Sequence, residues 1–193
     1  MIDALHTMDR DITLALNGLH CTAADHMWQL LSNSDVWIPL YLIIIMFLLK
    51  SLGWKKGLIV LLSVILTVVA CDQLGNVVKH AVERLRPCYD RAMVDAGLRI
   101  LENRGGFFGF YSAHAANAFG LAICASLGLR NDYRHRYGRF TGWIFVWAVL
   151  VSLSRVFVGK HYLGDVVAGA VVGIAVGFIF ALLAREAVFR MRS

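Results

Sequence analysis

Five long apolar segments dominate this chain of 193 residues. Each is near the length of roughly 17–25 residues that a helix needs to cross a bilayer. Apolar residues make up 59% of the chain and charged residues 17%, which leaves too little charge for the surface of an ordinary soluble domain. The sequence therefore predicts an all-α fold, a polytopic membrane helix bundle in one domain over residues 1–193. The expected spans, within a transmembrane core over 36–184, are about 36–53, 57–79, 113–129, 141–158 and 163–184.

Residues 1–34 have a different pattern. Apolar positions such as Ile12 and Leu16 alternate with charged ones such as Asp9 and Arg10. This mixture is typical of amphipathic helices that lie in the membrane interface, so we expect two short interfacial helices here. Residues 1–10 lack the basic start and apolar core of a signal peptide, which argues against cleavage.

Basic residues lie mainly between the apolar segments, and this distribution predicts the topology. Such clusters stay on the cytoplasmic side of a membrane, so we expect five spans with the N-terminus and the loop over 80–112 outside. The net charge of +6 then reflects topology, and no nucleic-acid partner is expected. The clusters are Lys50, Lys55 and Lys56; Arg130, Arg134, Arg136 and Arg139; and Arg185, Arg190 and Arg192.

The loop over 80–112 carries five arginines, at positions 84, 86, 91, 99 and 104. Four acidic residues balance them, so the loop could bind an anionic ligand or could simply be solvated. A single arginine near the end of a span usually extends toward the lipid headgroups, and we interpret Arg84 in this way. His20, His26, His80 and His135 are interpreted as structural.

Polar residues follow the second apolar segment at spacings of three or four. Such spacing places them on one face of a helix, which we expect to reach the outer surface and to end at Pro87. Ionisable groups inside membrane spans usually mark a functional site. The residues of this expected stripe are Asp72, Asn76, Lys79, Glu83 and Arg86.

Two further polar clusters meet the stripe at the same outer face under this topology. One is at the start of the third span, around Ser112 and His114, and the other runs from Arg155 to Asp165 across the turn between the last two spans. Lys79, Arg86 and Arg155 offer three positive charges for a phosphate dianion. Ser112 and the backbone N–H groups at the start of a helix could donate further hydrogen bonds.

His161 and Asp165 are four residues apart, so one helical turn would bring them together. A carboxylate on one imidazole nitrogen fixes the tautomer and leaves the other nitrogen free to attack phosphorus. His114 is then available as the general acid for the departing oxygen.

These residues resemble the three-part signature of the type 2 phosphatidic acid phosphatase superfamily. The matching segments are Lys79-x6-Arg86-Pro87, Tyr111-Ser112-Ala113-His114 and Ser154-Arg155-x5-His161-x3-Asp165. The resemblance implies hydrolysis of phosphate esters without a metal, through a phosphohistidine on His161. It further implies that Asp165 orients the nucleophile, that His114 is the general acid, and that phosphate binds Lys79, Arg86, Ser112, Arg155 and the Ala113 amide.

The second part departs from the usual Pro-Ser-Gly-His. Tyr111 stands in place of the proline and Ala113 in place of the glycine. Alanine keeps the N–H donor, so phosphate binding survives if the backbone there does not need a positive φ. Tyrosine adds a hydroxyl near the pocket, so these two positions bear on fine geometry and substrate choice.

The expected function is dephosphorylation of a lipid phosphate or diphosphate at the periplasmic face of the bacterial inner membrane. Undecaprenyl diphosphate is favoured weakly, with lipid A and phosphatidylglycerophosphate as alternatives. A transporter or a non-catalytic headgroup binder, including an inactive lipid sensor, is the alternative from another class. We expect no cofactor and no metal, and the sequence leaves the oligomeric state open.

Two smaller expectations concern the cysteines and the glycines. Cys21 and Cys88 could both face the outside and form a disulfide, whereas Cys71 and Cys124 lie in apolar runs as packing residues. Gly169, Gly173 and Gly177 recur at every fourth position, which favours close helix packing within the bundle over dimerisation.

Overall fold

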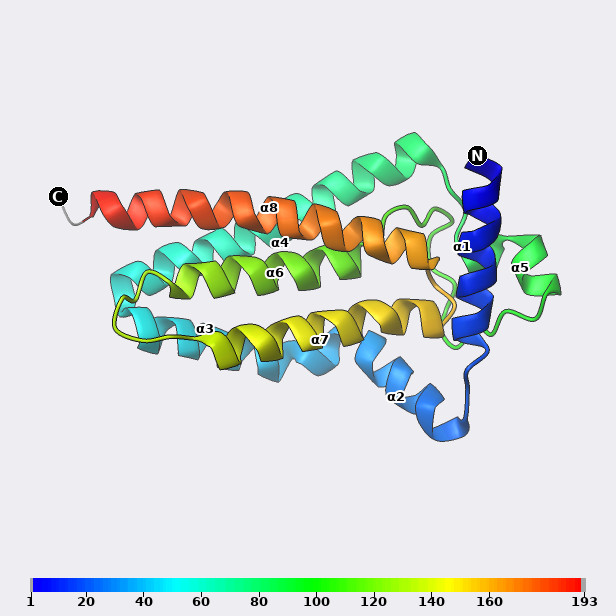
Figure 1. The fold of residues 1–193 in the computed structure, drawn as a ribbon, viewed down its shortest axis with the longest axis horizontal. Coiled ribbons are helices and arrows are strands. Elements are labelled where there is room, and N and C mark those ends of the chain that lie inside the picture. Colours follow the sequence, from blue (N-terminus) through cyan, green and yellow to red (C-terminus); the bar gives the residue numbers. More distant parts are fainter. Residues whose placement is uncertain (1, 192–193) are drawn as a thin grey trace.

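A computed structural model describes residues 2–191 of the chain, and in that range it is a bundle of helices (Figure 1). Among the described residues the one ladder contact is an isolated antiparallel bridge between Leu85 and Phe108. The elements are α1 (Ile2–Asn17), α2 (Thr22–Ser32), η1 (Ser34–Trp37), α3 (Ile38–Leu52), α4 (Trp54–Val82), η2 (Pro87–Tyr89), α5 (Arg91–Asp95), α6 (Ala113–Leu129), α7 (Gly138–Phe157) and α8 (Leu163–Arg190).

Four helical stretches are long and apolar enough to cross a membrane: Ser34–Leu52, Trp54–Val82, Gly138–Phe157 and Leu163–Arg190. The fifth predicted span is the shorter apolar helix α6, with the bounds expected from the sequence. The prediction of an all-α membrane bundle is therefore confirmed. The last span extends beyond the predicted range, because α8 continues to Arg190.

Helix α6 lies at the centre of the bundle, packed against α4, α7 and α8. Its shortness fits this position, because neighbouring helices surround it. The predicted glycine stripe of α8 lies directly against the backbone of α6. A Cβ on Gly173 would lie 2.1 Å from the carbonyl oxygen of Ala116, and a Cβ on Gly169 would lie 2.4 Å from the carbonyl oxygen of Ser112. The stripe is thus used for packing within the bundle, and it fixes the start of α6 against α8.

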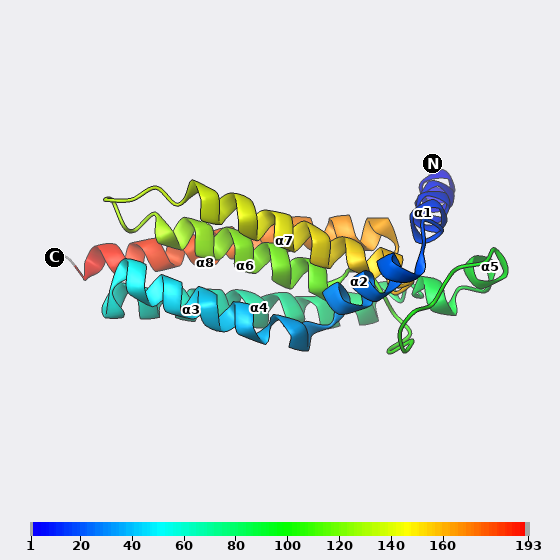
Figure 2. The ribbon, with the colours of Figure 1, turned by 90° about the horizontal axis from the view of Figure 1, so that it is seen from below.

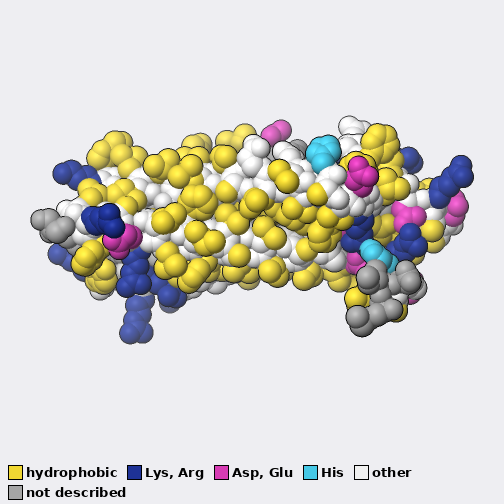
Figure 3. Space-filling view, turned by 90° about the horizontal axis from the view of Figure 1, so that it is seen from above, with side chains coloured by type: hydrophobic (Ala, Val, Ile, Leu, Met, Phe, Trp, Pro, Cys, Tyr) yellow, Lys and Arg dark blue, Asp and Glu magenta, His cyan; other side chains and the backbone are white. Residues whose placement is uncertain are grey.

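The two ends of the bundle differ in charge and in structure (Figures 1 and 2). The α3–α4 and α6–α7 turns and the C-terminal part of α8 lie at one end, so the three predicted basic clusters lie together there. Arg192 belongs to one of these clusters but falls outside the described residues. Hydrophobic side chains cover the middle of the face shown in Figure 3. This apolar belt with charged ends is the surface that a membrane requires.

Helix α1 lies across the opposite end of the bundle (Figure 1). Its outer face exposes Leu5, Met8 and Ile12. The inner face is tied to the bundle by buried polar groups: the Asn17 side-chain amide donates to the carbonyl oxygens of Val156 at 3.3 Å and Phe157 at 2.9 Å. Exposed apolar residues beside exposed charged ones such as Arg10 and Asp11 fit a helix at the membrane surface.

The prediction that the helix of the second span continues to Pro87 is wrong. Helix α4 ends at Val82, Glu83 adopts a left-handed conformation with φ 51°, and Arg86 lies in the loop that follows. The cause is pairing between distant segments: the Arg86 N–H donates to the Phe107 carbonyl at 2.9 Å, and the Gly109 N–H donates to the Arg84 carbonyl at 2.8 Å. The helical stripe therefore stops at Lys79.

The cysteines are all free thiols. Cys21 is exposed and Cys88 is buried, with its sulfur 3.8 Å from the Arg104 carbonyl oxygen. The structure contains no Cys21–Cys88 disulfide. Cys71 and Cys124 are buried packing residues, as predicted.

Candidate functional site

The candidate site is at the α1 end of the bundle, where the ends of four long helices meet. His114, at the start of α6, interacts electrostatically with Lys79, Arg86, Arg155 and His161. The Ser112 N–H donates to the Asp165 carbonyl at 3.0 Å, which joins the start of α6 to the first turn of α8. The structure thus brings together the predicted set: Lys79, Arg86, Ser112, Ala113, His114, Arg155, His161 and Asp165.

His161 lies in the turn between α7 and α8, and its ring is buried. Its Nδ1 is 3.5 Å from Oδ2 of Asp165, at the outer limit of a hydrogen bond. Such contacts are often long before substrate binds. Burial lowers the pKa of His161 to about 4, and the Asp165 carboxylate opposes this shift. The ring is therefore neutral at pH 7, as a nucleophile must be.

The start of α6 presents donors to the same space. Ser112 precedes the helix, but its hydroxyl does not cap it; the hydroxyl is buried and has no partner among the described residues. Ala113, the first residue of α6, does not have a positive φ, so a side chain is tolerated where the signature usually has glycine. The Tyr111 hydroxyl donates to the Cys71 carbonyl at 3.1 Å, within the helix packing.

Arg155 is in the last turn of α7 and is almost fully buried. Its Nη1 donates to the carbonyl oxygen of Ser32 at 3.1 Å and also to the Ser32 hydroxyl. The Nε atom of Arg155, like Nδ1 of His161 and Oγ of Ser112, is buried without a hydrogen-bond partner in the described part of the chain. Unpaired buried polar groups cost free energy unless a ligand satisfies them. A tetrahedral oxyanion would supply acceptors for Arg155 and Ser112, whereas Nδ1 of His161 faces Asp165.

Lys160 and Glu102 were not predicted as part of this site. The Glu102 carboxylate lies 3.5 Å from Nη1 of Arg155 and 3.8 Å from Nζ of Lys160. A Cβ on Gly105 would lie 3.4 Å from Nη1 of Arg86 and 3.6 Å from Nζ of Lys160, so the two cations flank the same glycine. Burial lowers the pKa of Lys160, and the charge of Arg155 adds to this effect. The available signal was the position of Lys160 directly before His161, the predicted nucleophile.

The interpretation of Arg84 as a headgroup-directed side chain is wrong. Its Nη1 donates to Oδ1 of Asp165 at 2.6 Å and its Nη2 to Oδ2 of Asp9 at 2.7 Å. Two buried or half-buried carboxylates outweigh the tendency of an arginine to reach water. Arg84 therefore neither waits for an anionic ligand nor extends into solvent. It forms two ion pairs inside the protein.

Two further arginines of the outer loop and two of the histidines interpreted as structural form contacts outside the predicted site. Arg99 pairs with Asp25 at 2.5 Å, and the guanidinium of Arg104 lies 5.7 Å from the centre of the Tyr89 ring. His80 packs edge-on against Phe108, and His135 contacts Asp132. These structural contacts agree with the interpretation of those two histidines.

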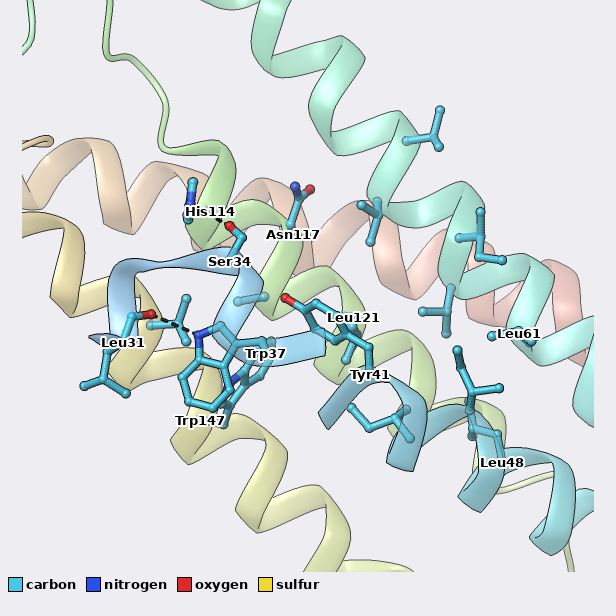
Figure 4. Close-up of a pocket in the computed structure, with 18 of the residues that line it drawn as sticks. Leu31, Ser34, Trp37, Tyr41, Leu48, Leu61, His114, Asn117, Leu121 and Trp147 are labelled. Carbon is cyan, nitrogen blue, oxygen red and sulfur yellow. Dashed lines mark hydrogen bonds between the residues drawn. The ribbon is translucent and has the colours of Figure 1, made fainter. Parts of the chain in front are cut away.

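An elongated apolar cavity of about 430 Å³ leads from the site into the bundle between α3, α4 and α6. His114, Ser34 and Asn117 lie at one end of it, and Leu48 and Leu61 at the other (Figure 4). The Ser34 hydroxyl is 3.2 Å from Nε2 of His114.

The α4 side of this cavity reaches the outer surface of the bundle. Ile65 and Val69 line the cavity, yet they are 50% and 49% exposed. Both residues belong to a membrane-spanning helix. The cavity therefore opens toward the lipid, and an apolar chain could enter it from the bilayer.

Within residues 2–191, no three or more His, Cys, Asp or Glu side chains converge as metal ligands do. The donors of the site are cations, hydroxyls and N–H groups, which bind anions. This donor set can hold a phosphate directly, with a neutral imidazole beside it.

The chain matches the sequence profile of the PAP2 superfamily over residues 56–189. It is 35% identical over its whole length to a lipid A 4'-phosphatase of Bacteroides thetaiotaomicron, covering 84% of that protein. A lipid A 4'-phosphatase of Porphyromonas gingivalis is 31% identical over 88% of the chain and 70% of its own length.

Two solved structures share the fold. One is the PAP2-type phosphatidylglycerolphosphate phosphatase of Bacillus subtilis, with a TM-score of 0.72 and 23% identity over 95% of this chain and 87% of that one. The other is LpxE of Aquifex aeolicus, with a TM-score of 0.63 and 21% identity over 88% of this chain and 92% of that one.

Proposed function

Because the chain belongs to the PAP2 superfamily and is a lipid phosphatase of that type, we propose that its substrate is lipid A, from which it removes the 4'-phosphate. Both lipid A 4'-phosphatases carry this activity in their names, and one of them aligns with the whole of this chain over 84% of its own length. This support favours lipid A over undecaprenyl diphosphate, the substrate expected first from the sequence. The phosphatidylglycerolphosphate phosphatase is less than 25% identical and supports the fold alone.

The observation that supports a lipid substrate is that the apolar cavity is continuous with the cationic residues of the site, Lys79, Arg86 and Arg155. His114 lines the apolar cavity and also interacts electrostatically with Arg86, Arg155 and Lys79. A phosphate among these cations would leave the acylated sugar that carries it at the mouth of the cavity, where an acyl chain could enter. A soluble phosphate ester would gain nothing from such a cavity, whereas an acyl chain is stabilised by leaving water.

The proposed reaction proceeds in two displacements. A nitrogen of His161 attacks phosphorus while Asp165 holds the other nitrogen, and the bond from phosphorus to the ester oxygen breaks. A bound phosphate dianion favours the protonated form of His114, which gives its proton to the departing oxygen, so the lipid leaves as an alcohol. Water, deprotonated by His114, then attacks the phosphohistidine; inorganic phosphate leaves and His161 is regenerated. Lys79, Arg86, Arg155, Ser112 and the Ala113 amide hold the phosphate oxygens in both steps.

The proposed location is the bacterial inner membrane, with the site facing the periplasm. The three basic clusters lie at the end of the bundle opposite the site (Figure 1). The positive-inside rule assigns such clusters to the cytoplasm. The site would then meet lipids of the outer leaflet.

The test is phosphate release by detergent-purified protein from lipid A, undecaprenyl diphosphate, phosphatidylglycerophosphate and phosphatidic acid, with mass spectrometry to locate the phosphate removed. We expect release from lipid A at the 4'-position and no release by His161→Ala. Turnover of another lipid alone would contradict the substrate. Full turnover by His161→Ala would contradict the nucleophile, and binding of lipid A without turnover by the wild-type protein would favour the headgroup binder.

A further inference from the structure

We infer that Arg84 and Asp9 are positioning residues for the nucleophile: Asp9 on the N-terminal helix α1 holds Arg84, and Arg84 holds the carboxylate of Asp165 beside His161. The inference rests on the proposed function, because it assigns a task to groups outside the phosphate-binding set. Helix α1 would then contribute to the geometry of the site through Asp9.

The geometry forms a continuous chain of contacts. Asp9 Oδ2 accepts from Nη2 of Arg84 at 2.7 Å, and Nη1 of the same guanidinium donates to Oδ1 of Asp165 at 2.6 Å. The other carboxylate oxygen of Asp165 accepts from the Tyr162 N–H at 3.2 Å and lies 3.5 Å from Nδ1 of His161. Both oxygens of a fully buried carboxylate are thereby fixed. One is fixed by Arg84, so the other faces the imidazole.

Arg84 itself is fixed on two sides. Its guanidinium lies over the Tyr162 ring, 4.1 Å from the ring centre. The Tyr162 hydroxyl donates to Oδ2 of Asp90 at 2.7 Å, and Asp90 also pairs with Arg10 of α1 at 2.6 Å. A planar guanidinium held between two carboxylates and an aromatic ring has little freedom to rotate. It is therefore suited to hold Asp165 in one orientation.

Helix α1 also binds the backbone on both sides of His161. The Leu163 N–H donates to the Thr13 hydroxyl at 3.0 Å, and the Gly164 N–H donates to Oδ1 of Asp9 at 2.8 Å. A Cβ on Gly164 would lie only 2.7 Å from Oδ2 of Asp9, so this close approach requires glycine. Together with the contacts of Asn17 to the end of α7, these bonds fasten both ends of the turn that carries the nucleophile.

The charge of Arg84 has a consequence that packing alone would not have. Arg84 offsets the negative charge of Asp165, which otherwise stabilises a protonated His161. Removing the positive charge should therefore make His161 easier to protonate. The other groups that act on His161 or adjoin it come from each neighbouring element: His114 on α6, Arg155 on α7, Asp165 on α8, Arg86 in the outer loop and Lys160 in the same turn.

The first experiment reads the protonation of His161 without requiring turnover. Histidine labelled with ¹⁵N is followed by NMR during a pH titration of the full-length protein in micelles, with His161→Ala to identify the resonance. We expect Arg84→Gln to raise the midpoint of His161 by roughly one pH unit, and Arg84→Lys to restore most of the wild-type value. An unchanged midpoint and tautomer in Arg84→Gln would overturn the inference, whether or not the protein hydrolyses lipid A.

The second experiment links Asp9 to Arg84 through the rate of phosphate release from lipid A. Asp9→Asn keeps an acceptor for the Gly164 N–H but loses the ion pair, so we expect kcat to fall about tenfold with little change in KM. In the Arg84→Gln background the same substitution should have almost no further effect, because the partner is absent. Asp11→Asn is the matched control, since Asp11 is exposed on the same helix.

The outcomes of the kinetic experiment are distinct. Additive losses from Asp9→Asn and Arg84→Gln would overturn the coupling, and a tenfold loss in Asp11→Asn would show a general effect of charge on α1. Failure of the wild-type protein to release phosphate from any lipid would instead refute the proposed function. In that case the titration alone decides whether Arg84 controls His161.

Discussion

The carboxylate of Glu102 lies 3.5 Å from Nη1 of Arg155, among the cations that we propose bind phosphate. It also lies 3.8 Å from Nζ of Lys160. A phosphate dianion that enters must overcome repulsion from this negative charge, which is worth on the order of 1 kcal/mol at this degree of exposure. We expect Glu102→Gln to lower KM for the lipid phosphate by roughly threefold to tenfold, with kcat nearly unchanged, in a steady-state assay of phosphate release.

A matched control is available at the other end of the bundle. Glu186 pairs with Arg190 on the exposed surface of α8, so Glu186→Gln removes the same charge far from the site. This variant should keep the wild-type KM. A higher KM in Glu102→Gln would mean that the carboxylate holds Arg155 in place for phosphate, and the repulsion argument would be wrong.

The close packing of α6 on α8 gives a second test. A Cβ on Gly173 would lie 2.1 Å from the carbonyl oxygen of Ala116, so Gly173→Ala must push the two helices apart. We expect a loss of roughly 1–3 kcal/mol in the free energy of unfolding, as for other overpacked cores. Activity should fall with it, because His114 and Ser112 are at the start of α6. Unfolding in mixed micelles, followed by circular dichroism, measures the loss.

Gly142→Ala is the control for this substitution. Gly142 lies in α7 with nothing within 4 Å of the place its Cβ would take. Here alanine should stabilise the helix by about 0.5–1 kcal/mol, because glycine in a helix costs conformational entropy. Equal losses in the two variants would contradict the packing argument.

The fold could be predicted from the sequence because its signals are local. An apolar run of span length indicates a helix wherever its neighbours lie. The three polar clusters could be predicted to meet because consecutive spans alternate in direction, so the outer ends of all spans share one face. His161 and Asp165 lie one helical turn apart, and the spacing alone brings them together.

Contacts between distant parts of the chain could not be predicted in this way. Arg84 meets Asp165 across 81 positions and Asp9 across 75, and nothing in the local pattern of either segment encodes that pairing. The end of α4 was misplaced for the same reason, because the Arg86 backbone pairs with Phe107 in place of a further helical turn. Glu102 belongs to an irregular loop, where side-chain spacing does not indicate direction.

The lowered pKa of His161 predicts how stability depends on pH. The pKa is about 4 in the folded protein and near 6.5 in an unfolded chain. Between these values the unfolded chain binds a proton that the folded protein does not, so acidification destabilises the fold. Relative to His161→Gln, which cannot titrate, the wild-type protein should lose roughly 2 kcal/mol between pH 7.5 and pH 5.

The measurement is the unfolding free energy of both proteins in mixed micelles at the two pH values. All other titrating groups are shared, so their effects cancel in the difference between the variants. A difference that stays constant with pH would show that His161 titrates normally in the folded state, and the argument for a neutral buried nucleophile would fail.

Removal of divalent metals should leave the reaction intact. The proposed phosphate ligands are arginine, lysine, serine and backbone groups, so no step needs a metal ion as a Lewis acid. We expect the same kcat and KM for lipid A with and without excess EDTA. Loss of activity that Mg²⁺ or Zn²⁺ restores would contradict the proposed mechanism.

The orientation in the membrane can be tested with two variants that each have one exposed cysteine, Arg91→Cys and Arg134→Cys, each combined with Cys21→Ser. Arg91 is exposed at the start of α5, beside the site, and Arg134 is exposed in the α6–α7 turn at the opposite end. The three native cysteines that remain are buried.

In intact cells with a permeabilised outer membrane, a membrane-impermeant maleimide should label the cysteine at 91 and not the one at 134. Both should react after the inner membrane is broken, because both positions are exposed in the fold. The reverse pattern in intact cells would place the basic clusters outside, and the site would then face the cytoplasm.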